Sequence, residues 1–153
     1  MTKILFVCLG NICRSPLAEF LMKDLIKKQG LESQFYIESA ATSTEELGNG
    51  VYPPVKKLLA ARGIDCSQKR ARQMTAYDYD RFDYIICMDG SNLRNMESIA
   101  ADIDGKYHRL LDFTDSPHDV ADPWYTRDFL LTERDVDCGC KALLEYIKKA
   151  TTN

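Results

Sequence analysis

The sequence has little histidine, no long apolar run and no excess of positive charge. Its two histidines, His108 and His118, stand ten residues apart with no cysteine or carboxylate cluster at metal-ligand spacing, so neither is predicted to bind a metal or to act in catalysis. The formal net charge of −3 argues against a protein that binds nucleic acid through a dense lysine and arginine surface. Any anion-binding site must therefore be local.

The apolar run at residues 4–7 is far too short for a signal peptide or a membrane span, and no other stretch approaches that length. We therefore expect a cytoplasmic protein that makes no membrane contact. Six cysteines in such a chain are more typical of reduced thiols than of a disulfide framework. No linker, internal repeat or low-complexity tract divides the sequence, which predicts a single domain over residues 1–153.

Short apolar runs alternate with helical patterns along the chain. This alternation predicts an α/β fold, a doubly wound parallel sheet whose ligand crevice lies beyond the carboxyl ends of the strands. The loop that starts at Cys8 falls in that place. Strands are expected at residues 3–7, 35–40, 84–88 and 108–113. Helices are expected after Pro16, from about Pro54 to a stop at Gly63, after a capping box at Thr75, from Ser91, and after a capping box at Thr132.

The run Cys8-Leu9-Gly10-Asn11-Ile12-Cys13-Arg14-Ser15 joins the first strand to the first helix. Backbone N–H groups from Leu9 to Arg14 can surround a phosphate group, and the helix N-terminus favours an anion there. Gly10 and Asn11 tolerate the left-handed conformations that such a curl is expected to require. Arg14 offers a planar fork for two phosphoryl oxygens. The run lacks the lysine of a nucleotide-binding loop, which disfavours nucleoside triphosphates.

Cys8 is the predicted nucleophile of a phosphatase. Thiols at helix N-termini near arginine can have pKa values lowered to ~3.5–7.5, so a thiolate is expected at neutral pH. A thiolate can attack phosphorus without a general base, a metal or a cofactor. Ser15 can donate a hydrogen bond to the sulfur. The alternative is that Cys8 and Cys13 are small buried hydrophobic residues, but the fixed positions of Arg14 and Ser15 favour phosphate chemistry.

A phenolate leaving group, with a parent pKa of ~10, departs slowly unless an acid protonates it. The best candidate is Asp122 in the segment Asp122-Pro123-Trp124-Tyr125. Pro123 biases Asp122 toward an extended backbone, and the aromatic rings of Trp124 and Tyr125 can wall an aryl pocket. Without further information, an ordinary Asp-Pro turn is the favoured interpretation of this segment.

Residues 8–15 together with residues 122–125 resemble the low-molecular-weight protein tyrosine phosphatases. Ser39-Ala40, Ala71-Arg72-Gln73 and residues 83–93 extend this resemblance over nearly the whole chain. The resemblance implies a four-stranded parallel sheet flanked by helices, phosphotyrosine-containing proteins as substrates, and a cysteinyl-phosphate intermediate. It implies that Cys8 is the nucleophile, that Arg14 binds the phosphate and its transition state, and that Asp122 is the general acid and base.

The resemblance also implies roles for residues that support the loop. Hydroxyl groups of Ser15 and Ser39 are expected to hold Asn11 in its strained conformation. Cys13 corresponds to a second loop cysteine that can form a protective disulfide with the nucleophile, a role that carries the same weight as simple packing. The family usually has an aromatic residue where this chain has Glu45 and Glu46, which we therefore expect to form a specificity rim. It also often has a histidine just before Ala-Arg-Gln, where this chain has Gln68-Lys69-Arg70.

Two other functions compete with the phosphatase. A thiol-dependent arsenate reductase of the same fold needs two further cysteines in one mobile segment, whereas Cys66 and Cys87 are far apart and Cys87 falls in a predicted strand. A non-catalytic phosphotyrosine-binding module would not need the combination of Cys8, Arg14 and Asp122. For the phosphatase we expect a monomer or weak self-association.

Overall fold

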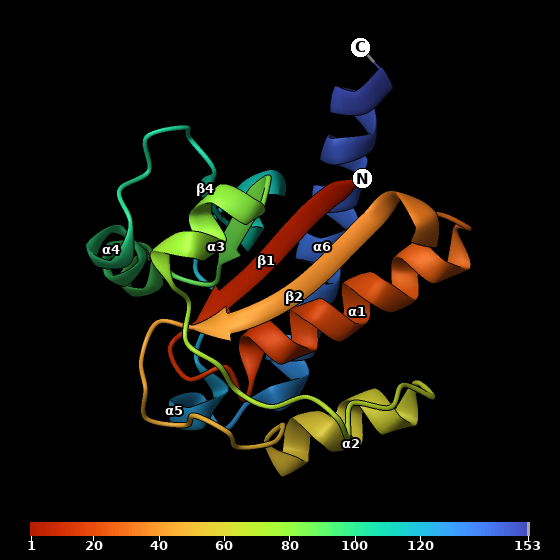
Figure 1. The fold of residues 1–153 in the computed structure, drawn as a ribbon. Coiled ribbons are helices and arrows are strands. Elements are labelled where there is room, and N and C mark those ends of the chain that lie inside the picture. The colour runs from red at the N-terminus through yellow and green to blue at the C-terminus, as the bar shows by residue number, and fades with distance from the viewer. Residues whose placement is uncertain (153) are drawn as a thin grey trace.

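The computed structural model describes residues 1–152 and contains a four-stranded parallel sheet in the order β2-β1-β3-β4. The central strand β1 (Thr2–Cys8) pairs with β2 (Phe35–Ala41) on one side and with β3 (Tyr84–Cys87) on the other. The short strand β4 (Tyr107–Arg109) forms the far edge. Figure 1 shows β1 and β2 running side by side toward the end of the molecule that carries α5. The predicted α/β class and parallel sheet are confirmed.

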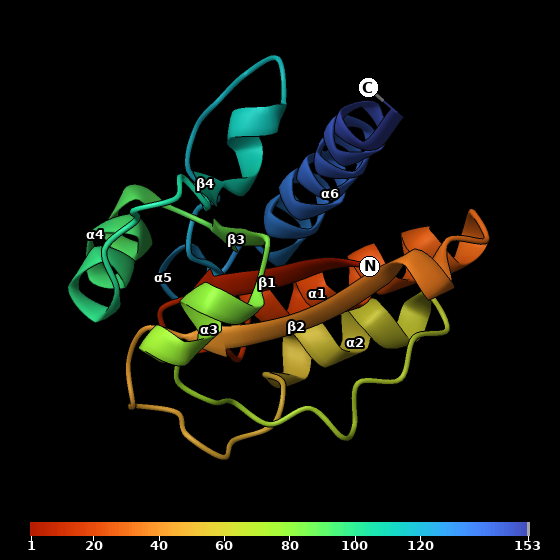
Figure 2. The same ribbon diagram turned by 45° about the horizontal axis from the view of Figure 1, so that its top comes forward.

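Strand β1 is apolar at successive positions because both faces of the sheet are covered. Ile4 and Phe6 belong to one core cluster, whereas Leu5 and Val7 belong to the other. The helices therefore form two layers around the sheet, as Figure 2 shows. The first cluster is covered by α1 (Arg14–Lys28), α2 (Pro53–Ala61) and α6 (Phe129–Thr152), and the second by α3 (Ala76–Arg81) and α4 (Gly90–Ile99).

Several helix ends follow the predicted sequence signals. Gly63 follows the end of α2 with a φ of 75°, a left-handed conformation that glycine adopts without strain. The capping box of Thr75 and Asp78 opens α3. Helix α1 begins at Arg14, two residues before the predicted start, so that Pro16 lies in its first turn, where its missing N–H is not needed.

Helix α4 begins at Gly90, and its N-cap is Asp89 rather than the predicted Ser91. The Asp89 carboxylate accepts a hydrogen bond from the Asn92 N–H at 2.7 Å, and the Asn92 side chain accepts one from the Asp89 N–H at 3.1 Å. This reciprocal pair ends β3 and turns the chain into the helix. Asp89 is thereby held at the carboxyl edge of the sheet.

The predicted fourth strand at residues 108–113 is only partly correct. After β4 ends at Arg109, residues Leu110–Phe113 form a 3₁₀ helix, η2. The Asp112 carboxylate accepts a hydrogen bond from the Arg109 N–H at 3.2 Å and so caps this turn. Leu110 packs so closely on α6 that a Cβ atom at Gly139 would lie 2.5 Å from its Cγ. Packing against α6 therefore replaces further strand pairing.

The last helix also begins earlier than predicted, at Phe129 instead of Thr132. The Asp128 carboxylate accepts a hydrogen bond from the Leu131 N–H at 3.0 Å and caps the first turn. The Thr132 hydroxyl instead bonds back to the carbonyl oxygen of Asp128 at 3.2 Å, as hydroxyl groups inside helices do. Besides η2, two further short elements were not predicted: the 3₁₀ helix η1 (Glu32–Gln34) and the helix α5 (Pro123–Thr126).

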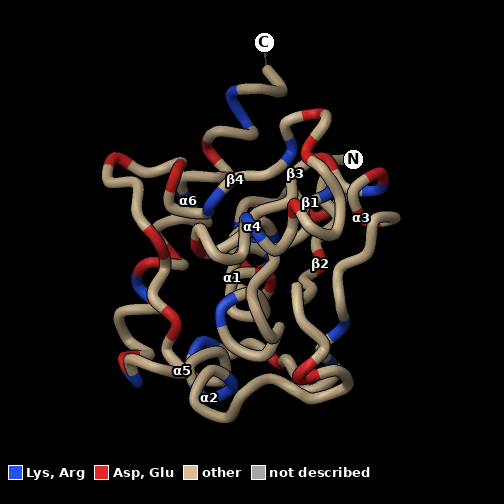
Figure 3. Tube along the Cα trace, turned by 90° about the vertical axis from the view of Figure 1, so that its left-hand side faces the viewer, with Lys and Arg blue, Asp and Glu red and all other residues tan. Residues whose placement is uncertain are grey.

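Acidic and basic residues are interspersed along the chain (Figure 3). None of the helices within residues 1–152 combines the length and apolar character that a membrane span requires. The same residues contain no group of three histidine, cysteine or acidic side chains arranged to hold a metal ion.

Candidate active site

Cys8 ends β1, and the following residues curl back beneath it before α1 begins. The Asn11 N–H donates to the Cys8 Sγ at 3.3 Å, and the Ser15 Oγ lies 3.0 Å from the same sulfur. Asn11 has a φ of 59°, in the left-handed region that asparagine tolerates. The Asn11 N–H and the Ser15 hydroxyl can both donate a hydrogen bond to the sulfur.

Gly10 does not have the left-handed conformation that was expected of it. The reason for glycine here is close packing instead, because a Cβ atom would lie 3.3 Å from the Cγ of Glu46. The loop therefore depends on a single left-handed residue, Asn11.

A cavity of about 140 Å³ opens above Cys8. It brings together the loop after β1, the acidic residues after β2 and the segment around α5, which are far apart in sequence. Nearly all the residues predicted to contact substrate line it. The lining residues are Cys8, Leu9, Gly10, Ile12, Cys13, Arg14, Glu45, Glu46, Asp122, Trp124 and Tyr125. Asn11, Ser15 and Ser39 lie beneath this surface and are buried.

Arg14 is 2% exposed and is held by three oxygens. Its Nη1 donates to the Asp89 carboxylate at 2.7 Å and to the Val120 carbonyl at 2.8 Å. Its Nη2 lies 3.4 Å from the Asp122 carboxylate. Burial lowers the pKa of Arg14, but the Cys8 sulfur, Asp89 and Asp122 together raise it above its usual value. The guanidinium is therefore a fixed positive charge at the base of the cavity.

Asp122 has the extended backbone that Pro123 favours, with φ −76° and ψ 112°. It is the N-cap of α5, and one carboxylate oxygen accepts a hydrogen bond from the Trp124 N–H at 3.0 Å. The other oxygen faces Arg14. The segment therefore forms a capped helical turn, and the Asp122 carboxyl group lines the same cavity as Cys8.

The aromatic wall of the cavity is supported from outside. Trp124 packs on Tyr52 with ring centroids 5.0 Å apart. Arg127, whose φ of 60° ends α5, donates to the Tyr52 hydroxyl at 3.2 Å and covers the ring of Phe129. Tyr125 is 76% exposed and stands at the mouth.

The side chain of Asn11 is fixed from three sides. Its Oδ1 accepts from the Arg72 N–H at 3.2 Å, while its Nδ2 donates to Ser15 at 2.7 Å and to Ser39 at 3.0 Å. Every polar position of this amide except its second carbonyl lone pair is thus used. These contacts offset the cost of the left-handed backbone.

Cys13 is buried beside Cys8, and both thiols are free. Burial, followed by the charges of Cys8 and Asp122, raises the pKa of Cys13 to about 12. Cys13 is therefore a protonated thiol at neutral pH, unlike a nucleophile.

Three charged residues at or behind the site were missed by sequence reasoning. Asp89 could have been found, because it follows β3, and the carboxyl ends of neighbouring parallel strands lie together. Glu19 and Lys69 had no comparable signal. They are 50 residues apart in sequence, yet they meet at 3.6 Å behind Ser39.

This arrangement has the parts of a phosphatase site: a sulfur, a buried guanidinium and a carboxyl group around one cavity. The sequence model described as "Low molecular weight phosphotyrosine protein phosphatase" matches residues 3–153. The chain belongs to this family of protein tyrosine phosphatases.

Individual relatives agree over almost their whole length. The chain is 40% identical over 152 residues to the low molecular weight protein-tyrosine-phosphatase YfkJ of Bacillus subtilis, covering 97% of both chains. It is 42% identical over 157 residues to the low molecular weight phosphotyrosine protein phosphatase of Gallus gallus, covering 93% of each. The crystal structure of YfkJ superposes with a TM-score of 0.95, at 39% identity, covering 98% of this chain and 96% of that one.

Proposed function

We propose that this protein hydrolyses phosphotyrosine in proteins, and simple aryl phosphates, with Cys8 as the nucleophile. The observation that carries the proposal is the position of the Cys8 sulfur, which faces Ser15 and Asn11 as hydrogen-bond donors and shares its cavity with Arg14 and Asp122. Backbone N–H groups of the loop and Arg14 bind the phosphoryl oxygens.

In the first step the Cys8 thiolate attacks phosphorus. The bond from phosphorus to the tyrosine oxygen breaks, and Asp122 gives its proton to that oxygen, so that a neutral phenol leaves. Arg14 stabilises the charge on the phosphoryl oxygens in the transition state. Because Asp89 and Val120 already hold the guanidinium in place, little reorganisation is needed at that moment.

In the second step water attacks the phosphocysteine. The Asp122 carboxylate takes a proton from this water, the phosphorus–sulfur bond breaks, and inorganic phosphate is released together with the thiolate. The Ser15 hydroxyl, 3.0 Å from the sulfur, stabilises the departing thiolate.

The positions of the other cysteines support phosphatase over arsenate reductase. Cys87 lies in β3 and is 0% exposed, and Cys66 is 4% exposed. A relay that carries a disulfide outward needs thiols that can move and reach solvent. The buried thiols of Cys66 and Cys87 do not meet this requirement for movement and access to solvent.

The role of Asp122 is tested by changing the leaving group. The variant Asp122→Asn is expected to lower kcat for phenyl phosphate by about 100-fold, because the phenolate then departs without a proton. It is expected to affect p-nitrophenyl phosphate much less, since that leaving group is more acidic. Steady-state kinetics of both substrates measure the ratio, and acid quenching followed by mass spectrometry detects a phosphoryl group on Cys8.

The matched control is Asp119→Asn, which removes a carboxylate three residues away that is exposed and pairs with Arg109 outside the cavity. It should leave the ratio of the two substrates unchanged. Equal losses on both substrates in Asp122→Asn would exclude Asp122 as the acid. Absence of phosphate on Cys8 throughout turnover of wild type and variant would argue against the covalent intermediate.

We further propose that Glu45 and Glu46 form an acidic rim that selects among phosphopeptides. Both line the cavity, and Glu46 is fixed by a hydrogen bond of 2.6 Å from the Asn49 side chain. Glu45 is exposed and free to approach residues that flank the phosphotyrosine. Two carboxylates on the rim of the cavity repel the acidic residues of a peptide bound there.

The variant Glu45→Trp is expected to raise kcat/KM for phosphopeptides with acidic flanking residues by about fivefold, because it removes one repulsive charge and adds aromatic surface. The variant Glu45→Gln separates these causes, since it removes the charge alone. The ratio of kcat/KM for acidic to neutral phosphopeptides should rise in both variants, and p-nitrophenyl phosphate, which has no flanking residues, serves as the reference for changes within the cavity itself. An unchanged preference between acidic and neutral phosphopeptides would refute the rim.

A further inference from the structure

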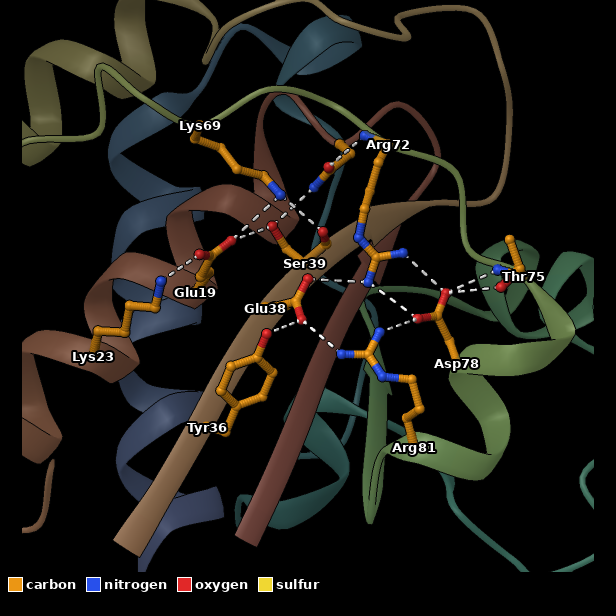
Figure 4. A network of polar contacts seen from close by, with 11 residues as sticks. Glu19, Lys23, Tyr36, Glu38, Ser39, Lys69, Arg72, Thr75, Asp78 and Arg81 are labelled. Atoms are coloured by element: carbon orange, nitrogen blue, oxygen red, sulfur yellow. Dashed lines mark hydrogen bonds and ion pairs between the residues drawn. The ribbon is translucent and has the colours of Figure 1, made fainter. Parts of the chain in front are cut away.

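Lys69 lies on the loop between α2 and α3, and its side chain points toward Glu19 and Ser39 (Figure 4). Its Nζ donates to the Ser39 carbonyl at 2.8 Å and lies 3.6 Å from Glu19. The same oxygen of Glu19, Oε1, accepts a hydrogen bond from the Ser39 hydroxyl at 2.5 Å. The Lys69 side chain is 12% exposed and that of Glu19 is 6% exposed, so this pair is largely shielded from solvent.

The hydrogen bonds between this pair and the loop allow only one consistent assignment of donors and acceptors. A carboxylate can only accept, so the Ser39 hydroxyl must give its proton to Glu19. Ser39 can then only accept from Asn11, and the orientation of the Asn11 amide agrees, because its oxygen already accepts from the Arg72 N–H. The Asn11 Nδ2 is therefore the donor to Ser39.

Ser15 connects Asn11 to the sulfur. The second hydrogen of the Asn11 Nδ2 goes to the Ser15 oxygen at 2.7 Å, so the Ser15 proton must point elsewhere. Its two candidate acceptors are the Cys8 Sγ at 3.0 Å and the Ala40 carbonyl at 3.5 Å. The shorter contact is the one to the sulfur. The donors and acceptors are thus fixed on both sides of Asn11: its amide donates through Ser39 toward Glu19 on one side and through Ser15 toward the Cys8 sulfur on the other.

We infer that Lys69 is a positioning residue, which holds the Glu19 carboxylate and Ser39 in place and thereby keeps the Asn11 amide oriented so that Ser15 donates to the Cys8 sulfur. This inference rests on the proposed function of Cys8. Lys69 does not line the cavity, so it acts without touching the substrate. It occupies the region where the family often has a histidine.

Other charged groups lie near these hydrogen bonds and also affect the charge balance around them. Lys23 contacts the second oxygen of Glu19 at 2.6 Å, but it is 45% exposed and makes no contact with Ser39. Burial lowers the pKa of Lys69 and Arg72 lowers it further, while Glu19 and Glu38 oppose this shift. The charged groups that share the cavity with Cys8 are Arg14, Asp122, Glu45 and Glu46, and the Cys13 thiol lies beside it.

The test follows alkylation of Cys8 by iodoacetamide as a function of pH, with the modified peptide identified by mass spectrometry. In Lys69→Met the midpoint pH is expected to rise by about 0.5 to 1 unit, because a buried carboxylate loses its cation and the donor to the sulfur is less well fixed. The acidic limb of the kcat/KM profile for p-nitrophenyl phosphate should move in the same direction. Lys69→Arg should behave like wild type.

Two further variants separate charge from packing. Lys69→Gln retains a donor for the Ser39 carbonyl but carries no charge, so it should show the same upward shift even if Lys69→Met folds poorly. The double variant Glu19→Gln with Lys69→Met removes both charges while an amide oxygen remains to accept from Ser39. Its midpoint should return toward that of wild type.

An unchanged midpoint in both Lys69→Met and Lys69→Gln would overturn the inference, and so would a shift in Lys23→Met as large as that in Lys69→Met. Because alkylation does not need turnover, this result is independent of the proposed activity. Wild-type hydrolysis that depends on Cys8, together with an unshifted midpoint in the Lys69 variants, would remove only the inference. Absence of Cys8-dependent hydrolysis would remove the proposed function.

Discussion

Replacing Cys8 by serine is expected to lower kcat for p-nitrophenyl phosphate by at least about 10⁴-fold, in buffer without added metal. The structure supplies the reason. The neighbours within hydrogen-bond distance of the Cys8 sulfur are the Ser15 hydroxyl and the Asn11 N–H, and neither is a base. A thiolate needs no base, but a serine hydroxyl at this position would have nothing to accept its proton.

The variant should still bind phosphate, since the loop N–H groups and Arg14 are unchanged. Inorganic phosphate can therefore be used with both proteins. Its inhibition constant for wild type is compared with its dissociation constant for Cys8→Ser. Cys138→Ser is the matched control, because Cys138 is exposed on α6 and lies outside the cavity. The mechanism would be wrong if Cys8→Ser retained wild-type turnover, or if wild type hydrolysed no aryl phosphate.

The substitution Arg14→Lys should lower kcat by about 10³-fold and weaken phosphate inhibition. In the structure the Arg14 guanidinium bonds to Asp89 and to the Val120 carbonyl through one nitrogen, which leaves other N–H groups for the phosphoryl oxygens. A lysine ammonium is a point charge without this planar fork. It cannot keep both protein contacts and also bind two oxygens side by side.

Steady-state kinetics with p-nitrophenyl phosphate and inhibition by inorganic phosphate measure this effect, and circular dichroism verifies that the variant is folded. Arg109→Lys serves as the control, because Arg109 also pairs with aspartates but lies outside the cavity. If Arg14→Lys kept kcat within an order of magnitude of wild type, the guanidinium would not be the phosphate clamp.

The strands that the sequence predicted well are the central strand β1 and the two strands that pair with it, β2 and β3. Strands β1 and β2 each begin within one residue of the predicted start and extend one residue past the predicted end, and β3 begins at the predicted residue and ends one residue earlier. The edge strand β4 was predicted less well. It ends at Arg109 because Leu110 turns onto α6 at Gly139, a contact between segments far apart in sequence.

In the candidate site, too, residues that are contiguous in sequence were predicted better than contacts between distant segments. Residues 8–15 are contiguous, so their residue types and spacing are enough to indicate a phosphate-binding loop. Asp122 depended on a resemblance, because an Asp-Pro pair by itself is more typical of a turn. Asp89 lay within a segment that carries the resemblance, but its contact with Arg14 depends on the neighbouring positions of β1 and β3.

The sequence by itself determined the α/β class, the family and the chemistry available at Cys8, because local patterns and a contiguous loop carry that information. Only the tertiary structure decided what supports the loop and Arg14 from behind. Folding brings Glu19, Ser39 and Lys69 from three separate segments behind Asn11, and it places Asp89 against Arg14. Hydrogen-bond direction and ion pairing depend on distances of a few ångströms, and residues far apart in a chain acquire such distances only through packing.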